Sequence, residues 1–316
     1  MACHWGFPLL PISIRTCLCF GLYVSILEGT SVKLATIKYE NEEQPVLLLE
    51  GGAVLIKSLN DYASIGLPLS LYELVGLDAV SELKRTVSKF SESDWIALPK
   101  VPSEELDFVA PYRNPHYIFG VGMNYVEKAI DLQTKQIEDA PVCFMKPTSC
   151  LIGMNEMIEL PNFSKVVTAE GELCLVIGKS CHEVSPEEAL SYVSGYTTSL
   201  DLTAKDIHAQ NPRFVQMSKV FKTFFSFGPQ IQLLEGTESL SELVVQSVQN
   251  GEVRAANIVG NMMYTPAFIV SYISQFVTLQ PGDLIMTGTP GSFELSHGDI
   301  AGCQITGLLS LENRVI

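Results

Sequence analysis

The chain has 316 residues, of which 47% are hydrophobic and 17% charged, enough apolar material for one large or two smaller packed domains. This composition excludes an intrinsically disordered chain. The net charge of −15 repels phosphate groups, so we expect neither nucleic acid nor a membrane surface as a partner, whereas a small anionic substrate stays compatible with it.

Eight cysteines are scattered along the chain, and none forms a Cys-x-x-Cys pair. Scattered cysteines in a chain of this length argue against a disulfide framework. We therefore expect a reducing compartment and a cytoplasmic location.

The first 31 residues differ in composition from the rest, because Arg15 and Glu28 are their only charges. Residues 17–27 form an apolar stretch of 11 residues, which is too short to span a bilayer. The stretch is either the core of an export signal, followed by small residues at 29–31, or part of an extension that the fold does not need. We expect the dispensable extension, because no basic cluster precedes the stretch.

Residues 32–110 predict a small α+β domain. Lys33–Tyr39 reads as a first strand, and Val46–Ile56 as a β-hairpin that turns at two glycines. Leu69–Phe90 has the apolar spacing of a helix. A proline-rich connection follows, so we expect a domain boundary there and a second domain over residues 111–316.

The second domain is predicted to be rich in strands. Ile118–Gly122 is a short apolar strand. Pro186–Val193 and Thr265–Phe276 predict helices, the first with a capping box formed by Ser185 and Glu188. Because strands outnumber helices and no β-α-β alternation appears, the sequence favours an α+β, strand-rich fold over a doubly wound sheet.

Two glutamates open a buried strand near the middle of the chain. Glu170 and Glu172 lie two positions apart in the run from Ala169 to Gly178, so an extended backbone places both carboxylates on one face. Their mutual repulsion would be relieved by a divalent cation, to which Asp201 could supply a third oxygen ligand. The alternative is an acidic strand end that faces water.

Nine ordered motifs stand out between residue 33 and the end of the chain. They are Gly122-Met123-Asn124-Tyr125, Phe144-Met145-Lys146-Pro147, Glu170-Gly171-Glu172-Leu173, Gly195-Tyr196-Thr197 leading to Asp201, Lys205-Asp206, Lys219 in a Lys-x-Phe context, Gly228-Pro229, Asn250-Gly251-Glu252, and Pro281-Gly282-Asp283 through Thr287-Gly288-Thr289-Pro290. In this order and spacing they resemble the fumarylacetoacetate hydrolase family, most densely from residue 111 onward.

The resemblance implies a catalytic domain folded as a mixed β-sandwich roll, behind the small N-terminal α+β domain. It implies a usually dimeric protein, so we expect a homodimer, and a Mg²⁺ or Mn²⁺ ion held by Glu170, Glu172 and Asp201. Members of the family act on β-diketo or 2-oxo acids, which makes a small anionic oxo acid the expected substrate.

The residues fit this chemistry. Three carboxylates leave coordination positions open for substrate oxygens, and the cation would stabilise an enolate. Lys219 matches the family's active-site lysine and would add positive charge. Thr289 and its glycine-rich loop could hold a substrate carboxylate. Lys146 matches the Lys-Pro segment, either as a substrate contact or as an ion-pair partner.

The chain departs from the family pattern at the residues that orient water. Hydrolytic and decarboxylating members carry a histidine and a glutamate where this chain has Lys128 and Asp131, and lysine is normally protonated at neutral pH. His208 stands where the family has a substrate-contacting glutamine, and Lys222 where close relatives carry aspartate or glycine. We therefore expect Lys128 and Asp131 to replace the dyad, and His208 to lie near the substrate.

These observations predict a Mg²⁺-dependent hydrolase that acts on a β-diketo or 2-oxo (di)carboxylic acid through a metal-stabilised enolate. A decarboxylase or a tautomerase/isomerase of 2-oxo acids such as oxaloacetate is the first alternative, because neither reaction consumes water. The decarboxylases of the family also carry the histidine–glutamate dyad, so the loss of the dyad alone does not distinguish them from hydrolases. A catalytically silent homologue that binds a metal or ligand is the second.

Overall fold

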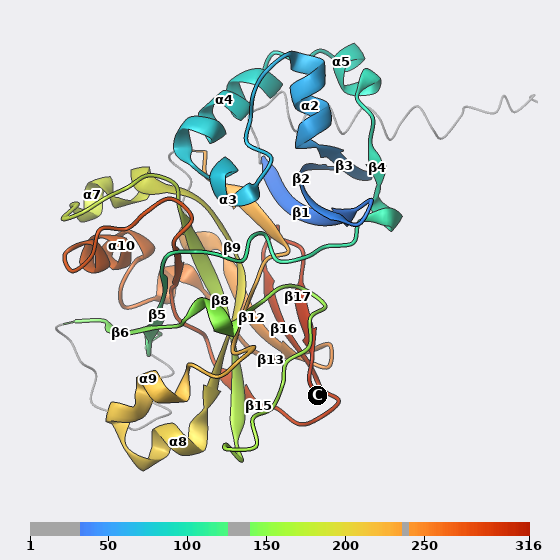
Figure 1. The fold of residues 1–316 in the computed structure, drawn as a ribbon. Helices are drawn as coiled ribbons and strands as arrows, with labels where there is room; N and C mark the ends of the chain where they lie inside the picture. The colour runs from blue at the N-terminus through green and yellow to red at the C-terminus, as the bar shows by residue number, and fades with distance from the viewer. Residues whose placement is uncertain (1–31, 126–139, 236–239) are drawn as a thin grey trace, which may run out of the picture.

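The structure is a computed structural model that describes residues 32–125, 140–235 and 240–316 (Figure 1). Helices α2 to α5 gather at one end of the molecule and α8 and α9 at the other, with long strands running between them (Figure 1). The predicted α+β, strand-rich class is confirmed.

Thirteen of the described strands form one mixed sheet, whose main path runs β4-β3-β2-β1-β11-β9-β8-β14-β5-β6. Its strands are β1 (Lys33–Tyr39), β2 (Glu42–Leu49), β3 (Gly52–Leu55), β4 (Val101–Pro102), β5 (Ile118–Gly122), β6 (Val142–Met145), β7 (Leu151–Ile152), β8 (Val167–Ile177), β9 (Val193–Ala204), β10 (Phe225–Phe227), β11 (Gln230–Leu233), β14 (Leu284–Met286) and β15 (Ser292–Glu294). A second sheet of four strands, in the order β13-β12-β16-β17, contains β12 (Val244–Gln249), β13 (Glu252–Ile258), β16 (Ile300–Ile305) and β17 (Leu311–Arg314).

The described α-helices are short. They are α2 (Ile56–Ala63), α3 (Leu71–Leu74), α4 (Leu77–Val87), α5 (Glu92–Ala97), α7 (Pro186–Ala189), α8 (Lys205–Gln210), α9 (Val215–Ser218) and α10 (Pro266–Ser274). Within the described ranges, no helix has the length and apolar character that crossing a membrane requires.

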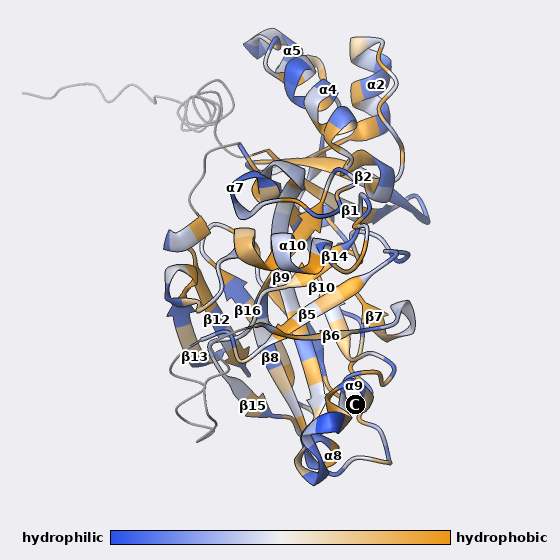
Figure 2. Ribbon diagram, turned by 90° about the vertical axis from the view of Figure 1, so that its left-hand side faces the viewer, coloured by the Kyte–Doolittle hydropathy of each residue, from blue (hydrophilic) through white to orange (hydrophobic). Residues whose placement is uncertain are grey.

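The antiparallel pair β8–β9 is the centre of the molecule, and every residue of both strands is buried. The four-stranded sheet covers one face of the pair, where Leu173 and Leu200 share a core with Val245 and Cys303. Hydrophobic residues, coloured orange, gather on the central strands β5, β9, β10 and β14, whereas α8 at one end of the molecule is mostly hydrophilic (Figure 2). Any polar group placed in the middle of this pair is therefore held away from bulk water.

Gly171 allows the two sheets to approach each other closely. A Cβ atom at this position would lie 2.8 Å from the Gln246 carbonyl oxygen and 3.2 Å from the Ser247 Cα on β12. Only glycine fits between Glu170 and Glu172 without moving β12, so the glutamates stay on a strand that is packed on both faces.

The predicted N-terminal strands are confirmed, with β1 at the expected residues and the β2–β3 hairpin turning at Gly51, whose φ is +79°. The long helix expected over Leu69–Phe90 is wrong, because Gly76 divides it into α3 and α4. The strand at Ile118–Gly122 is confirmed as β5.

Both helices predicted in the second domain are present but end earlier than expected, and the one predicted over Thr265–Phe276 is α10, Pro266–Ser274. The helix expected over Pro186–Val193 stops at Ala189, where a 3₁₀ turn leads into β9, and Ser185 caps no backbone N–H. The Ser185 hydroxyl instead lies 3.5 Å from the Glu188 carboxylate, so the predicted capping box is not formed. In contrast, Thr265 caps α10 by accepting a hydrogen bond from the Phe268 N–H.

The expected division near residue 111 stays a prediction. Strand β1 pairs with β11 of the large sheet, and one core cluster joins Leu34 and Val54 to Val176 and Phe227. The N-terminal residues therefore extend the same sheet and share its core.

Candidate metal centre

Three carboxylates meet where β8 and β9 pair. Glu170 lies opposite Asp201 in the antiparallel register, and Glu172 lies two residues further along β8. One carboxylate oxygen from each of Glu170, Glu172 and Asp201 lies within 4.8 Å of the others. Their exposed fractions are 8%, 2% and 0%, so these glutamates are not an acidic strand end in water.

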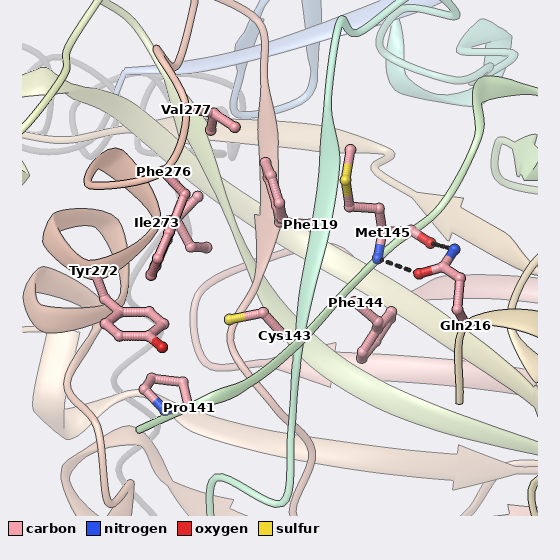
Figure 3. Close-up of a pocket in the computed structure, with 10 residues that line it drawn as sticks. All are labelled: Phe119, Pro141, Cys143, Phe144, Met145, Gln216, Tyr272, Ile273, Phe276 and Val277. Atoms are coloured by element: carbon pink, nitrogen blue, oxygen red, sulfur yellow. Dashed lines mark hydrogen bonds between the residues drawn. The ribbon is translucent and has the colours of Figure 1, made fainter. Parts of the chain in front are cut away.

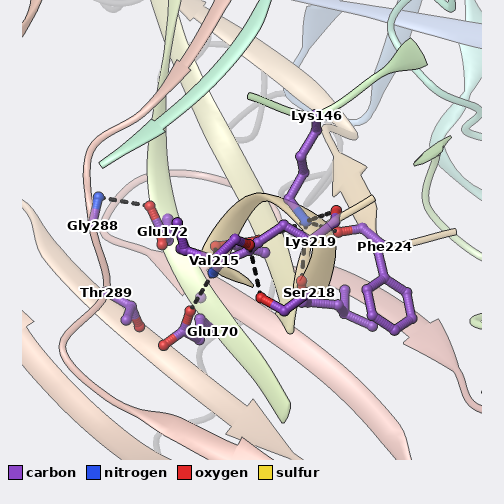
Figure 4. A network of polar contacts seen from close by, with 12 residues as sticks. Lys146, Glu170, Glu172, Val215, Ser218, Lys219, Phe224, Gly288 and Thr289 are labelled. Carbon is purple, nitrogen blue, oxygen red and sulfur yellow. Dashed lines mark hydrogen bonds and ion pairs between the residues drawn. The ribbon is translucent and has the colours of Figure 1, made fainter. Parts of the chain in front are cut away.

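Glu172 receives a backbone donor and no direct cation among the residues that the structure describes. The Gly288 N–H donates to its Oε2 at 2.6 Å (Figure 4). Burial and the neighbouring Asp201 and Glu170 charges hold the pKa of Glu172 well above the ordinary glutamate value. A buried carboxylate with this much negative charge beside it is stabilised by a cation.

Lys219 reaches the carboxylates from the end of α9 (Figure 4). Its Nζ lies 3.2 Å from Glu170 Oε2 and contacts Asp201 Oδ2 as well. Burial lowers the pKa of Lys219, but the negative charges of Asp201 and Glu170 have a larger effect and raise that pKa above the ordinary lysine value. Lys219 therefore stays protonated beside the centre.

The α9 helix is fixed to strand β6 through Gln216. The Met145 N–H donates to the Gln216 side chain at 3.1 Å, and the Gln216 amide donates back to the Met145 carbonyl at 2.6 Å (Figure 3). The Lys219 Nζ also lies 4.4 Å from the centroid of the Phe144 ring on β6, a favourable cation–π distance. These contacts set the direction from which the ammonium approaches.

Lys146 is the second cation, and it lies behind Asp201. Its Nζ is 2.8 Å from Asp201 Oδ1 and donates to three backbone carbonyls, those of Leu202, Lys219 and Phe224, at 2.7–3.0 Å. Burial lowers its pKa, and Asp201 opposes this effect. Protein atoms surround the ammonium and its side chain is 0% exposed, so Lys146 is placed as the ion-pair partner of Asp201.

Thr289 lies on the loop between β14 and β15, near Glu170 and Glu172 (Figure 4). Its hydroxyl is 2.9 Å from the Gly291 carbonyl and accepts from the Gly291 N–H at 3.2 Å. Gly288 has a φ of +105°, and a Cβ atom there would lie 2.7 Å from the Asn124 Cβ. The glycine lets the loop turn its amide toward Glu172.

His208 and Lys222 lie further out. His208 is on α8 with its side chain only partly exposed. Its partial burial and the Lys219 charge lower its pKa from 6.5, while the Glu170 charge acts in the opposite direction. Lys222 is 72% exposed and pairs with Glu159 at 2.6 Å, so it faces water. The predicted site residues Lys128 and Asp131 lie outside the described residues.

Sequence reasoning did not find three groups that complete the centre. They are the Gly288 amide, the Phe144 ring and the Ser247 hydroxyl, which contacts Thr289 and Gly171. Asn124 belongs to one of the ordered motifs, but its role is seen only in the structure. Its side-chain amide donates to the Thr287 and Tyr264 carbonyls and so fixes the start of the loop that carries Thr289. The only sequence signal for these groups was their place within or near the ordered motifs.

A cavity of about 550 Å³ lies beside β6 and α10 (Figure 3). Its lining is mostly apolar and includes Phe119, Cys143 and Phe276, and its polar side chains are Gln216 and Tyr272. Phe144 borders both the cavity and the Lys219 ammonium.

The three carboxylates have the donor atoms that a divalent cation requires. All three ligands are oxygen, they converge, and the lysines leave Glu172 without a direct cation in the described part of the chain. Hard ions such as Mg²⁺ and Mn²⁺ take this donor set. The fold and the centre thus define a strand-rich domain built around a buried acidic triad.

Comparison with known proteins agrees with this class. The family model for the fumarylacetoacetate (FAA) hydrolase C-terminal domain matches residues 117–316, more than half of the chain. The chain therefore belongs to the fumarylacetoacetate hydrolase family, as its motifs predicted, and is an enzyme of that family.

Named relatives cover most of the chain. Mitochondrial oxaloacetate tautomerase Fahd2a of Rattus norvegicus is 29% identical over 90% of this chain and 92% of its own length. The solved structure of fumarylacetoacetate hydrolase from Exiguobacterium antarcticum has a TM-score of 0.74 at 25% identity, covering 90% of this chain and 99% of that one. A 5-carboxymethyl-2-hydroxymuconate delta-isomerase structure from Mycobacterium smegmatis has a TM-score of 0.68 at 25% identity, covering 90% and 98%.

Proposed function

We propose that Glu170, Glu172 and Asp201 hold a Mg²⁺ or Mn²⁺ ion, and that the protein interconverts the keto and enol forms of a small 2-oxo dicarboxylic acid of the oxaloacetate type. The observation that carries the proposal is the convergence of three buried carboxylate oxygens within 4.8 Å, with a protonated lysine in contact with two of them. When bound, the ion would supply the positive charge that polarises the 2-oxo group.

The side chains have distinct roles in this reaction. Lys219 keeps its proton and presents an ammonium that stabilises negative charge on the oxo oxygen. Thr289 holds a carboxylate of the substrate through its hydroxyl and its own backbone amide, because the Gly288 and Gly291 amides already have acceptors within the protein. Lys146 makes no contact with the substrate and holds Asp201 in place from behind.

His208 is the proposed proton acceptor. Because its pKa is lowered, the imidazole is neutral at pH 7 and can take a proton from the carbon next to the oxo group. Returning that proton to the oxygen completes the tautomerisation, and no water is consumed.

Two findings support tautomerisation over hydrolysis. The rat relative that matches 90% of this chain is named as an oxaloacetate tautomerase. The chain also carries Lys128 and Asp131 where water-orienting residues are expected in hydrolytic members, and a tautomerase does not need them. The named hydrolase structure keeps hydrolysis of a β-diketo acid as the second candidate.

The test compares Glu172→Gln with a matched control, Glu159→Gln, because Glu159 is an exposed glutamate that pairs with Lys222. Mg²⁺ affinity is measured by calorimetry, and loss of the enol form of oxaloacetate by ultraviolet absorbance. We expect E172Q to lose both metal binding and turnover, and E159Q to keep both. Full turnover by E172Q would contradict the proposal.

A second measurement separates the candidate functions. In ¹⁸O-labelled water, hydrolysis of a β-diketo acid places solvent oxygen in the new carboxylate, and tautomerisation breaks no carbon–carbon bond. Tight binding of oxalate without turnover of either acid would instead favour a silent homologue. Light scattering of the purified protein tests the expected homodimer, and imaging of a tagged chain tests the expected cytoplasmic location.

A further inference from the structure

Ser247 connects the second sheet to the candidate metal centre. It lies on β12 and is 0% exposed. Its hydroxyl accepts a hydrogen bond from the Gly171 N–H at 2.9 Å and lies 2.8 Å from the Gly291 carbonyl. It is also 3.4 Å from the Thr289 hydroxyl. One side chain therefore contacts both the strand that carries the glutamates and the loop that carries Thr289.

The contact with β8 depends on the glycine between the two glutamates. A Cβ atom at Gly171 would lie 3.2 Å from the Ser247 Cα, so a larger residue would push β12 away and break the hydrogen bond to the Gly171 N–H. The close approach also orients β8 at Glu170 and Glu172, because the bonded amide lies between them.

The hydrogen bonds around the loop show which acceptor receives the proton of the Ser247 hydroxyl. A serine hydroxyl has one proton to donate. Because its oxygen already accepts from Gly171, that proton goes to the Gly291 carbonyl. The Thr289 hydroxyl shares the same carbonyl at 2.9 Å, so Ser247 keeps this carbonyl satisfied when Thr289 turns its proton to a ligand.

We propose that Ser247 is a positioning residue, which fixes the loop from Gly288 to Gly291 on β8 and so presents Thr289 and the Gly288 amide to the centre. The effect on ligand binding rests on the proposed function of Thr289. The effect on the loop itself does not, because it depends only on hydrogen bonds within the protein.

The first test measures amide hydrogen exchange of the full chain. Ser247→Ala removes both hydrogen bonds, so exchange at Gly171, Gly288 and Gly291 is expected to rise about tenfold, as the loss of a buried hydrogen bond implies. Ser226→Ala is the control, because Ser226 lies on β10 with a buried hydroxyl that has no hydrogen-bond partner among the described residues. Unchanged exchange at these glycines in S247A would overturn the proposal, whether or not the protein binds a ligand.

The second test uses oxalate binding to the Mg²⁺-loaded protein. We expect S247A to weaken oxalate binding about tenfold, S226A to leave it unchanged, and Ser247→Cys to recover part of the loss through its weak S–H donor. In a cycle with Thr289→Val, the S247A effect should largely disappear, because the two residues act through one loop. Additive losses in the double variant would contradict positioning through Thr289 and indicate a general structural role.

If the wild type binds neither Mg²⁺ nor oxalate, the proposed function fails, and the exchange measurement still decides the role of Ser247. If the wild type binds both and S247A keeps normal exchange and affinity, the proposed function stands and the positioning role is wrong.

Discussion

Two buried aspartates, one just before β14 and one on β9, differ in the groups that surround their carboxylates. Asp283 lies at the start of β14, and its oxygens accept backbone N–H groups from Tyr117 at 2.7 Å and Gln280 at 2.8 Å. Asp201 lies in the middle of β9, and its oxygens face the ammonium groups of Lys146 and Lys219. Both aspartates are 0% exposed.

The difference lies in what surrounds each charge. Burial raises the pKa of Asp283, and two backbone amides oppose that shift, one from its own turn (Gln280) and one from the segment before β5 (Tyr117). Around Asp201, three buried carboxylates lie close together, and the described part of the chain sets two lysines against them. A buried carboxylate that accepts hydrogen bonds from backbone amides is satisfied without an ion. Several buried carboxylates that lie close together repel one another, and a bound cation relieves this repulsion.

The largest expected effect is the loss of turnover when Asp201, and not Asp283, is replaced. Asp201→Asn removes a proposed metal ligand and the partner of two lysines, so we expect turnover to fall about 1,000-fold. Steady-state kinetics with added Mg²⁺ measures this loss, and thermal unfolding checks that the variant folds. An active D201N enzyme would show that the two aspartates do not differ in function.

The second largest expected effect is a loss of stability when Lys146, the ion-pair partner of Asp201, is replaced. Lys146→Met leaves the Oδ1 atom of Asp201 and three backbone carbonyls without their lysine donor, so we expect the free energy of unfolding to fall by about 3 kcal/mol. Urea denaturation measures the change. Lys222→Met is the control, because the exposed pair with Glu159 should contribute less than about 1 kcal/mol. Equal losses in the two variants would contradict the structural role of Lys146.

The structural aspartate should show the opposite phenotype to Asp201. Asp283→Asn places an amide donor against a backbone N–H, so we expect a loss of about 2 kcal/mol in stability, with turnover changed less than about twofold. Urea denaturation and steady-state kinetics on one preparation give both values. A large loss of turnover in a folded D283N protein would remove the distinction between the two regions.

The smallest expected effect is a pH dependence at the edge of the Asp201 region. The pKa of His208 is lowered from 6.5, so its neutral, proton-accepting form is lost only as the pH falls through that lowered value. We expect kcat/KM of the wild type to decline below pH 6.5 and this decline to be absent in His208→Gln. His182→Gln, at a half-exposed histidine outside the centre, should leave the profile unchanged. An unaltered pH profile in H208Q would exclude His208 as the base.

Local patterns predicted much of the fold. Strand β1, the β2–β3 hairpin and β5 follow from apolar runs and glycine turns, which act over a few residues. The capping box at Ser185 failed because the Ser185 side chain contacts the Glu188 carboxylate and not a helix N–H. Gly76 divided the expected long helix, since a glycine there begins α4.

The sequence by itself determined that Glu170 and Glu172 share one face of a strand, because side chains alternate along an extended backbone. The ordered motifs added Asp201, Lys219 and Thr289 through the family resemblance. Only the tertiary structure decided that Glu170 lies opposite Asp201, that Lys146 lies behind it, and that Ser247 bridges two sheets. These contacts depend on strand register and sheet packing, which join residues far apart in the chain and leave no local periodicity to read.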